Sequence, residues 1–268
     1  MPIRVVIAGA TGWVGKALVP AVRAQEDMVL AGAVSRAAAG QDAGTAIGLD
    51  AVGVIVAATL EEALATPSDV LVDYTKPHVV KDHVLAAIAA GRHVVVGTSG
   101  LGAADYAEIA AQAEARGVGV VAAGNFSITA TLLKRFALMA AKYVPDVEII
   151  DYASAKKPDA PSGTARELAE ALAPVRGAST ARSQAEVSGV PETRGAAVGE
   201  GAGVQVHALR LPSYILSCEA LFGLPDERLT IRHDAGSSAA PYVAGTFLAI
   251  RRVTSIRGLV RGLDTLID

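Results

Sequence analysis

The chain has 268 residues, of which 51% are hydrophobic and 19% are charged, and its formal net charge is -3. This length fits one large domain or two small ones, and the apolar content excludes an intrinsically disordered chain. The small negative balance gives no support to nucleic-acid or anionic-membrane binding. The single cysteine, Cys218, excludes an internal disulfide, and no Cys/His cluster has metal-ligand spacing, so we expect no metal.

Targeting and membrane signals are missing from the sequence. No uncharged apolar run reaches the roughly 18 residues that a membrane-spanning helix needs. Arg4 is followed at once by an apolar run and a glycine turn, which is not the pattern of a signal peptide. We therefore expect a cytoplasmic protein.

The first half of the chain alternates short apolar runs with helical stretches. Strands are predicted at residues 3–8, 28–34, 54–57, 70–74, 93–96 and 118–122. Helices are predicted from Gly12 to about residue 24, at 79–90 and at 103–115. This alternation favours a parallel sheet with right-handed crossover helices, as in a Rossmann domain.

The pattern changes after Asn125. Helices are predicted at 128–143 and 164–172, and a strand at 147–152. The stretch 176–203 is rich in Gly, Ser and Ala and is predicted to be a loop. Strands are predicted at 204–211, 214–222 and 228–233, and the final residues, 241–253 and 258–267, are predicted to be helical. The fold class is therefore α/β, with an N-terminal Rossmann parallel sheet and a second α+β domain that has a mixed sheet.

A glycine turn joins the first predicted strand to the first predicted helix. It reads Gly-Ala-Thr-Gly-Trp-Val-Gly over residues 9–15. Glycine at these places lets the backbone approach a pyrophosphate, whose charge faces the N–H groups at the helix start. A turn without a ligand is the alternative, but the strand–turn–helix context favours a dinucleotide. The predicted contacts are Gly9, Thr11, Gly12, Trp13, Val14 and Gly15.

The end of the second predicted strand indicates which dinucleotide is preferred. NAD-binding domains usually carry a carboxylate there, about 20 residues after the glycines, which bonds the ribose 2′-hydroxyl. This chain has Ser35 and Arg36 instead, and Lys16 adds a further positive charge. Because Arg36 can pair with a 2′-phosphate and Ser35 can donate to it, we expect NADPH, with NADH possible but less favoured.

A second anion site is predicted before the helix at 164–172. Ser162 or Thr164 is a suitable N-cap, and the N–H groups around Gly163 can hold a carboxylate. Lys157 lies one loop away and can supply an ammonium. The alternative is an ordinary capped helix beside an exposed lysine, with no bound anion.

Several segments together resemble the dihydrodipicolinate reductase family over nearly the whole chain. Residues 73–77 read Asp-Tyr-Thr-Lys-Pro and resemble the family's Asp-Phe-Thr-x-Pro loop beside the nicotinamide ribose. Residues 97–100, Gly-Thr-Ser-Gly, and 123–128, Ala-Gly-Asn-Phe-Ser-Ile, resemble two further loops. The most specific match is 157–165, Lys-Pro-Asp-Ala-Pro-Ser-Gly-Thr-Ala, and 227–233 resembles a later strand.

This resemblance implies further cofactor contacts, a domain division and an assembly. The implied cofactor contacts are Tyr74, Thr75, Gly97, Thr98, Ser99, Asn125 and Phe126. The C-terminal segment returns to the first domain, so we expect a cofactor domain of residues 1–125 plus 235–268 and a substrate and oligomerisation domain of residues 126–234. A homotetramer or homodimer is expected.

The chain departs from the family where the substrate binds. The family's His-His pair, a proton donor and a substrate ligand, is replaced by Ala153 and Ser154, and a later arginine by Ser238. Glycine replaces the hinge proline at Gly124, and Leu216 to Cys218 replace Gly-Glu-His. Alanine cannot give a proton.

We therefore expect an NADPH-dependent reductase that acts on a C=N bond, or a C=C bond conjugated to it, in a non-standard, less anionic substrate. Tyr152, Ser154, Lys156 and Cys218 are expected to face that substrate. The expected catalytic residues are Lys157, Lys156 and Tyr152, and the expected substrate-binding residues are Ser154, Ser162, Gly163 and Thr164. One alternative is the family's own reaction, 4-hydroxy-tetrahydrodipicolinate reduction, with Lys157 or water giving the proton. A second is an NADPH sensor without turnover, although such a sensor needs no substrate pocket.

Overall fold

The computed structural model describes residues 1–267 and divides into two compact units. One unit combines Met1–Ser127 with the segment from Ala239 onward, and the other is Ile128–Ser238. The predicted domain boundaries, 125 and 235, lie a few residues before these.

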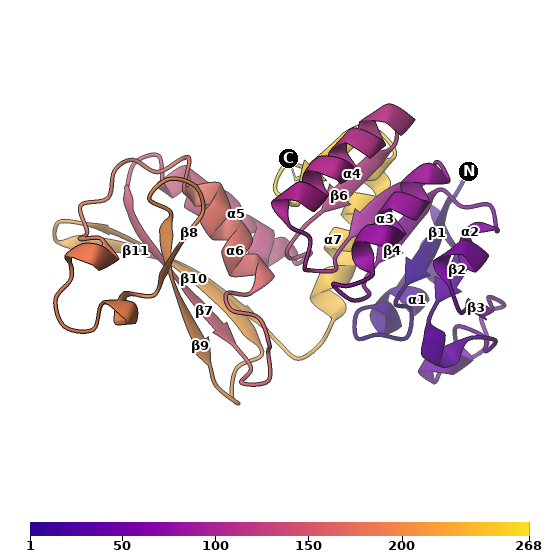
Figure 1. Cartoon of the computed structure of the whole chain (residues 1–268). Coiled ribbons are helices and arrows are strands. Elements are labelled where there is room, and N and C mark those ends of the chain that lie inside the picture. Colours follow the sequence, from indigo (N-terminus) through magenta and orange to yellow (C-terminus); the bar gives the residue numbers. More distant parts are fainter. Residues whose placement is uncertain (268) are drawn as a thin grey trace. The chain divides into compact units, whose positions relative to one another are not determined.

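The first unit is built on a parallel sheet of seven strands in the order β12-β6-β5-β4-β1-β2-β3 (Figure 1). The strands are β1 (Ile3–Ala8), β2 (Met28–Val34), β3 (Val56–Ala57), β4 (Val70–Asp73), β5 (His93–Val96), β6 (Gly119–Ala122) and β12 (Gly258–Arg261). The α-helices are α1 (Gly15–Arg23), α2 (Leu60–Leu64), α3 (Val80–Ala89), α4 (Ala103–Arg116) and α7 (Ala240–Val253), and the 3-10 helices are η1 (Arg36–Ala38) and η2 (Thr45–Ile47). The predicted Rossmann-like sheet is confirmed.

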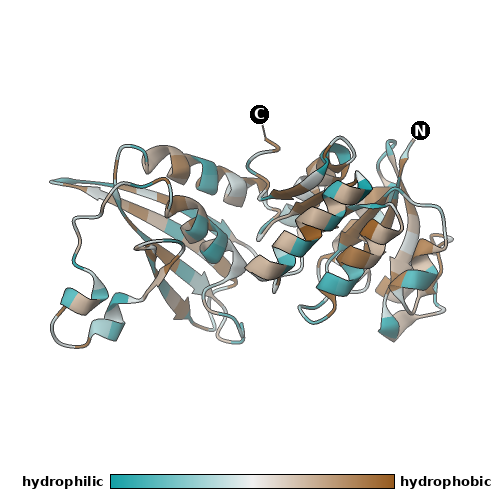
Figure 2. Cartoon of the chain, turned by 45° about the horizontal axis from the view of Figure 1, so that its top comes forward, coloured by the Kyte–Doolittle hydropathy of each residue, from teal (hydrophilic) through white to brown (hydrophobic). Residues whose placement is uncertain are grey.

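Helices cover both faces of this sheet. On one face, buried side chains such as Leu71 and Val94 pack against Val84 of α3 and Ile109 of α4. On the other face, α1 contacts β1 and β2, and α7 contacts β5 and β6. Figure 2 shows the strands of this sheet as largely hydrophobic and the helices as a mixture of hydrophobic and hydrophilic residues. The ligand-binding edge is therefore the row of loops at the carboxyl ends of the strands.

The prediction of a helix at 258–267 is wrong. Gly258 has φ +79°, and the next residues form β12, which pairs in parallel with β6 from Gly258↔Gly119 to Arg261↔Ala122. A four-residue apolar run has no periodicity that separates a strand from a helix, and here β6 offers an open edge. The short helix α2 was not predicted, although its N-cap Thr59 and Glu62 of its first turn form a capping box.

The second unit has a mixed five-stranded sheet in the order β11-β10-β7-β9-β8. Its strands are β7 (Asp146–Ala153), β8 (Ala196–Val198), β9 (Val204–Arg210), β10 (Leu216–Leu224) and β11 (Glu227–Ala235). Strands β7 and β9 are parallel, and the other pairs are antiparallel. The helices are α5 (Ile128–Ala140) and α6 (Gly163–Leu172), and the predicted loop 176–203 contains β8 and the 3-10 helices η3 (Gln184–Glu186) and η4 (Pro191–Arg194). The mixed sheet is confirmed.

Strand alternation gives this sheet two different faces. Val147, Ile149 and Phe222 lie on the face that packs against α5 and α6, where they meet Leu168 and Leu172. We call this the helix face, and the other side the open face. Among the described residues, no helix is both long and apolar enough to cross a membrane.

Candidate functional site

The glycine turn is held in a conformation that only glycine fits. Gly9 has φ +81°, and a Cβ there would lie 2.2 Å from the carbonyl oxygen of Tyr74. At Gly15, the first residue of α1, a Cβ would lie 2.2 Å from the carbonyl oxygen of Gly9. The Gly12 N–H donates to Gly9 at 2.9 Å and closes the turn. The backbone between β1 and α1 is therefore bare, as pyrophosphate binding requires.

Ser35 and Arg36 lie beside this turn at the end of β2. The hydroxyls of Thr11 and Ser35 are 2.6 Å apart, which ties the glycine turn to β2. Arg36 is exposed at the start of η1 and has no hydrogen bond or ion pair with another residue in the described part of the chain. Its guanidinium is therefore available to an anionic ligand.

Trp13 and Val14 of the glycine turn differ in how far their side chains are exposed to a ligand. Trp13 is 53% exposed, and its ring meets the ring of Tyr242 edge-on at 5.4 Å. The side chain of Val14 is buried, so only its backbone can contact a ligand.

A buried carboxylate joins the loops after β4 and β5. Asp73 is fully buried, and its Oδ1 accepts from the Thr75 N–H at 3.1 Å, the Thr75 hydroxyl at 2.7 Å and the Thr98 hydroxyl at 2.6 Å. The Nδ1 of His83 lies 2.8 Å from Oδ2. Thr75, Thr98 and the exposed Ser99 thus lie at the carboxyl ends of adjacent strands, whereas His83 was not among the predicted site residues.

Tyr74 and Phe126, which were expected to contact the cofactor, have rings engaged within the first unit, so their cofactor contacts stay a prediction. The Tyr74 hydroxyl pairs with Thr246 of α7 at 2.9 Å, and burial raises its pKa. A Cβ on Gly97 would lie 2.1 Å from the Tyr74 ring, so this ring fills the space that Gly97 leaves. Phe126 is 1% exposed and meets Tyr74 edge-on at 5.9 Å. Phe126 belongs to the buried core of the first unit, and Tyr74, which is partly buried, packs against it.

Asn125 has a backbone role in the same segment. Its side-chain oxygen accepts from the Ser127 N–H at 2.8 Å and shapes the turn before α5.

In the second unit, the start of α6 is anchored to β7. Ser162 is the N-cap, and its hydroxyl donates to Asp151 at 2.6 Å while its N–H donates to the same carboxylate at 2.8 Å. Arg210 of β9 completes the cluster through an ion pair with Asp151 at 2.8 Å. The expected contact of Ser162 with substrate stays a prediction, and its side chain is 1% exposed and already bonded to Asp151. Neither Asp151 nor Arg210 was predicted, because their meeting depends on the pairing of β7 with β9.

The N–H groups at this helix start and the two lysines remain as anion-binding groups. The Gly163 N–H has no acceptor among the described residues, and Thr164 follows it in the first turn. Lys157 forms an ion pair with Asp159 at 2.7 Å and keeps 29% of its side chain exposed. Lys156 is exposed, and its ammonium contacts no described side chain. A carboxylate could compete with Asp159 for Lys157.

Two residues expected to face the substrate lie elsewhere. Tyr152 is on the open face of the sheet, where its hydroxyl donates to Glu219 at 3.0 Å and Arg232 lies over its ring at 4.7 Å. Cys218 is 1% exposed in the helix-face core, and burial raises the pKa of its thiol to about 12. Successive strand residues point to opposite faces, so Tyr152 and Asp151 lie on opposite sides of the sheet. Cys218 is too deeply buried to face a ligand, and the role expected for Tyr152 stays a prediction.

The two positions that replace the family histidines differ in exposure. Ala153 is fully buried at the end of β7, whereas Ser154 is partly exposed and its hydroxyl accepts from the Lys156 N–H at 3.4 Å. His233 pairs with Cys218 of β10 and therefore lies on the helix face of the sheet. Its Nδ1 lies 3.0 Å from the Thr129 hydroxyl, and its Nε2 is buried with no partner among the described residues.

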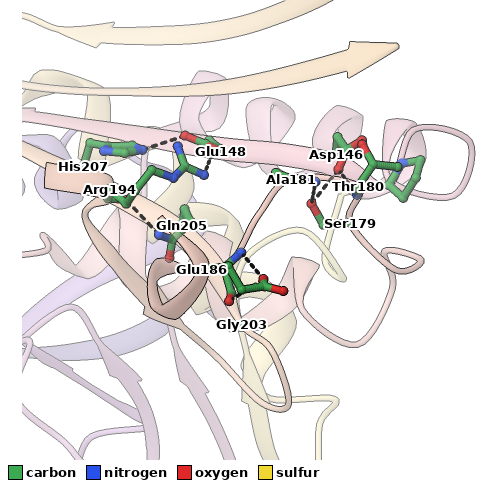
Figure 3. A network of polar contacts seen from close by, with 12 residues as sticks. Asp146, Glu148, Ser179, Thr180, Ala181, Glu186, Arg194, Gly203, Gln205 and His207 are labelled. Atoms are coloured by element: carbon green, nitrogen blue, oxygen red, sulfur yellow. Dashed lines mark hydrogen bonds and ion pairs between the residues drawn. The ribbon is translucent and has the colours of Figure 1, made fainter. Parts of the chain in front are cut away.

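A cavity of about 1240 Å³ lies on the open face, under the 176–203 segment. Glu148 pairs there with Arg194 and with His207 at 2.7 Å, and Asp146 accepts from Ser179 and Thr180 (Figure 3). Arg194 and His207 hold the pKa of Glu148 below its ordinary value, against the effect of burial. The Arg194 ion pair and the Ser179 and Thr180 hydrogen bonds fasten the segment to the sheet. None of the predicted substrate residues lines this cavity.

The fold and the glycine turn define a pyridine-nucleotide-dependent oxidoreductase. The family models for the N-terminus and the C-terminus of dihydrodipicolinate reductase match residues 3–126 and 129–267. The chain belongs to the dihydrodipicolinate reductase family. The 4-hydroxy-tetrahydrodipicolinate reductases of Synechococcus elongatus and Desulfitobacterium hafniense are 39% and 38% identical to it, each over 99% of both chains.

Solved structures agree with this placement. A dipicolinate-bound dihydrodipicolinate reductase from Paenisporosarcina is 33% identical and covers 100% of both chains with a TM-score of 0.79. An amine dehydrogenase from Mycobacterium smegmatis shares the fold at 16% identity, with a TM-score of 0.67, over 98% of this chain and 96% of its own. GenD2 from gentamicin A biosynthesis, solved in complex with NAD, shares the fold at 18% identity, with a TM-score of 0.69, over 99% of this chain and 90% of its own.

Proposed function

We propose that this protein is an NADPH-dependent reductase that reduces a C=N bond, or a C=C bond conjugated to it, in a small carboxylate-bearing molecule. The exposed, unengaged Arg36 at the end of β2, beside the bare glycine turn, is the observation that carries the cofactor preference. When bound, the reduced nicotinamide supplies the hydride.

The residues of the first unit bind and orient the cofactor. N–H groups of the glycine turn face the pyrophosphate, and Arg36 pairs with the 2′-phosphate while Ser35 stays tied to Thr11. Thr75 and Thr98 lie in the loops after β4 and β5, on the opposite side of β1 from Arg36. The order of the strands reverses at β1.

The residues of the second unit hold the substrate. The N–H of Gly163 and the start of α6 bind one carboxylate, and Lys157 exchanges Asp159 for the substrate. The positive charge of Lys157 then stabilises negative charge that develops as hydride is added. Lys157 or a water molecule supplies the proton, because Ala153 has none to give.

The leading candidate for the substrate is 4-hydroxy-tetrahydrodipicolinate. It is named by relatives that match this chain almost end to end at 37–39% identity. The structure with bound dipicolinate, which carries two carboxylates, supports a site for an anionic ring.

A less anionic cyclic imine is the second candidate. Ala153 and Ser154 stand where the family has a proton-donating and a substrate-binding histidine, and Ser238 replaces an arginine, so this chain carries less positive charge to attract a second carboxylate. Loss of a general acid typically costs 10²–10⁴-fold in rate.

One set of measurements tests both the cofactor preference and the substrate in this proposal. Dissociation constants for NADPH and NADH should differ in favour of NADPH, and equal constants would contradict the cofactor assignment. Turnover should then be compared on 4-hydroxy-tetrahydrodipicolinate and on a cyclic imine with one carboxylate. The second candidate is supported if only the monocarboxylate is reduced efficiently. Binding of NADPH with no turnover of either imine would contradict the proposed reaction.

A further inference from the structure

The contacts of Asp73 form a link between two loops and a helix. Its carboxylate accepts from Thr75 after β4, from Thr98 after β5 and from His83 in the first half of α3. The Thr75 N–H also donates to the Thr98 hydroxyl at 2.7 Å. A fully buried carboxylate is stable only when its acceptor sites are filled. Asp73 therefore fixes the positions of Thr75 and Thr98 together.

His83 has a distinct place in this link. Within the part of the chain that the structure describes, it makes the only polar contact to Oδ2 and is the only basic side chain paired with Asp73. Both threonines donate to Oδ1 and come from the loops themselves. The imidazole comes from a helix whose buried residues Val80, Val84 and Ile88 pack into the sheet core. His83 thus connects the two loops, through Asp73, to a helix that is packed into the sheet core.

The position of this link relates it to one half of the cofactor. The order of the strands reverses at β1, with β2 and β3 on one side and β4 and β5 on the other. A dinucleotide crosses this point, with one mononucleotide on each side. Arg36 and the end of β2 lie on the adenosine side. Thr75 and Thr98 therefore lie on the nicotinamide side.

We propose that His83 is a positioning residue, which acts through Asp73 to hold Thr75 and Thr98 in the geometry that binds the nicotinamide half of the cofactor. This inference rests on the proposed function, since it takes NADPH as the ligand. His83 does not contact the cofactor. Its Nδ1–H fixes the carboxylate, and the carboxylate fixes the loops.

Two polar substitutions separate this role from a merely structural one. In His83→Asn the side-chain amide nitrogen occupies the place of Nδ1, so the donor to Asp73 is kept. In His83→Gln the amide nitrogen corresponds to Nε2, so the donor is displaced. The two variants have similar polarity, and neither leaves an apolar group at a position that is partly exposed.

The readout is cofactor binding measured in two parts. Trp13 is the only tryptophan in the chain and lies in the glycine turn, so its fluorescence reports bound NADPH by energy transfer. Displacement of NADPH by 2′,5′-ADP, which lacks the nicotinamide half, gives the affinity of the adenosine side alone. His83→Gln should weaken NADPH about tenfold, the effect of losing one charge-assisted hydrogen bond, and leave 2′,5′-ADP within about twofold. His83→Asn should bind both ligands within about twofold of the wild-type affinity.

Each other result has a definite meaning. Equal NADPH affinity for the wild type and both variants would overturn the proposal. So would an equal loss of NADPH and 2′,5′-ADP, because this indicates general disruption of the fold. If His83→Asn lost as much NADPH affinity as His83→Gln, the donor at the Nδ1 position would not be what positions the loops, and the proposal would be overturned. A wild-type chain that bound 2′,5′-ADP but not NADPH would overturn the proposed function, and this inference with it.

Discussion

Gly9→Ala should disrupt the cofactor turn far more than its backbone angle alone predicts. The new Cβ would lie 2.2 Å from the Tyr74 carbonyl oxygen and 2.8 Å from its carbon, so the turn must move by about 1 Å to reach ordinary contact distance. The positive φ of +81° adds about 1–2 kcal/mol of strain for a residue with a Cβ. Displacement of binding groups by about 1 Å can cost about 100-fold in function. We therefore expect NADPH affinity to fall at least tenfold.

Gly48→Ala is the matched control. Gly48 has φ +83°, but a Cβ there would meet nothing within 4 Å. Both substitutions carry the same backbone strain, and only Gly9→Ala adds the clash. Urea unfolding measures the strain in each variant, and Trp13 fluorescence measures NADPH binding. Equal NADPH affinity for the two variants would refute the reasoning from close approach.

Three other outcomes are expected. Arg36→Ala should lower the affinity for NADPH about tenfold and leave the affinity for NADH nearly unchanged, because one exposed charge-assisted contact to the 2′-phosphate is lost. Titration with both cofactors measures this, and an equal loss of NADH affinity would contradict it. Lys157→Ala should lower kcat at least tenfold with an unchanged NADPH dissociation constant, as steady-state kinetics and Trp13 fluorescence would show; an unchanged kcat would remove Lys157 from the site. The second unit should assemble a homodimer or homotetramer, because β11 presents an unpaired edge with Leu229 47% exposed, and a monomer by light scattering at micromolar concentration would contradict this.

The cofactor half of the site could be predicted from the sequence because its signals are local. The glycine turn needs only a strand, a helix and three small residues in fixed order, and all of these lie within residues 3–23. The end of β2 follows as the next element. Even here the direction of side chains depended on packing: Tyr74 and Phe126 lie in recognisable loops, but their rings turn inward to each other and to Thr246, which is distant in sequence.

The substrate half was harder to predict because strand register decides it. The faces of β7 alternate, so Asp151 and Tyr152 are neighbours in the sequence but lie on opposite sides of the sheet. Asp151 meets Arg210 only because β7 and β9 pair in parallel, in a register that no local pattern indicates. The loop between β7 and α6 brings Ser162 back onto Asp151, so this side chain anchors α6.

This anchoring changes how the anion site of α6 should be understood. A serine hydroxyl has a single proton to donate, so an N-cap serine can bond only one carboxylate through it. Ser162 bonds a buried carboxylate of its own chain, which is itself paired with Arg210. The negative charge of Asp151 is thereby neutralised before a substrate arrives. The Gly163 N–H and the positive end of α6 are then left to attract an anion, and Lys157, held by Asp159, is the one cation of the segment 157–165 that can move to meet it.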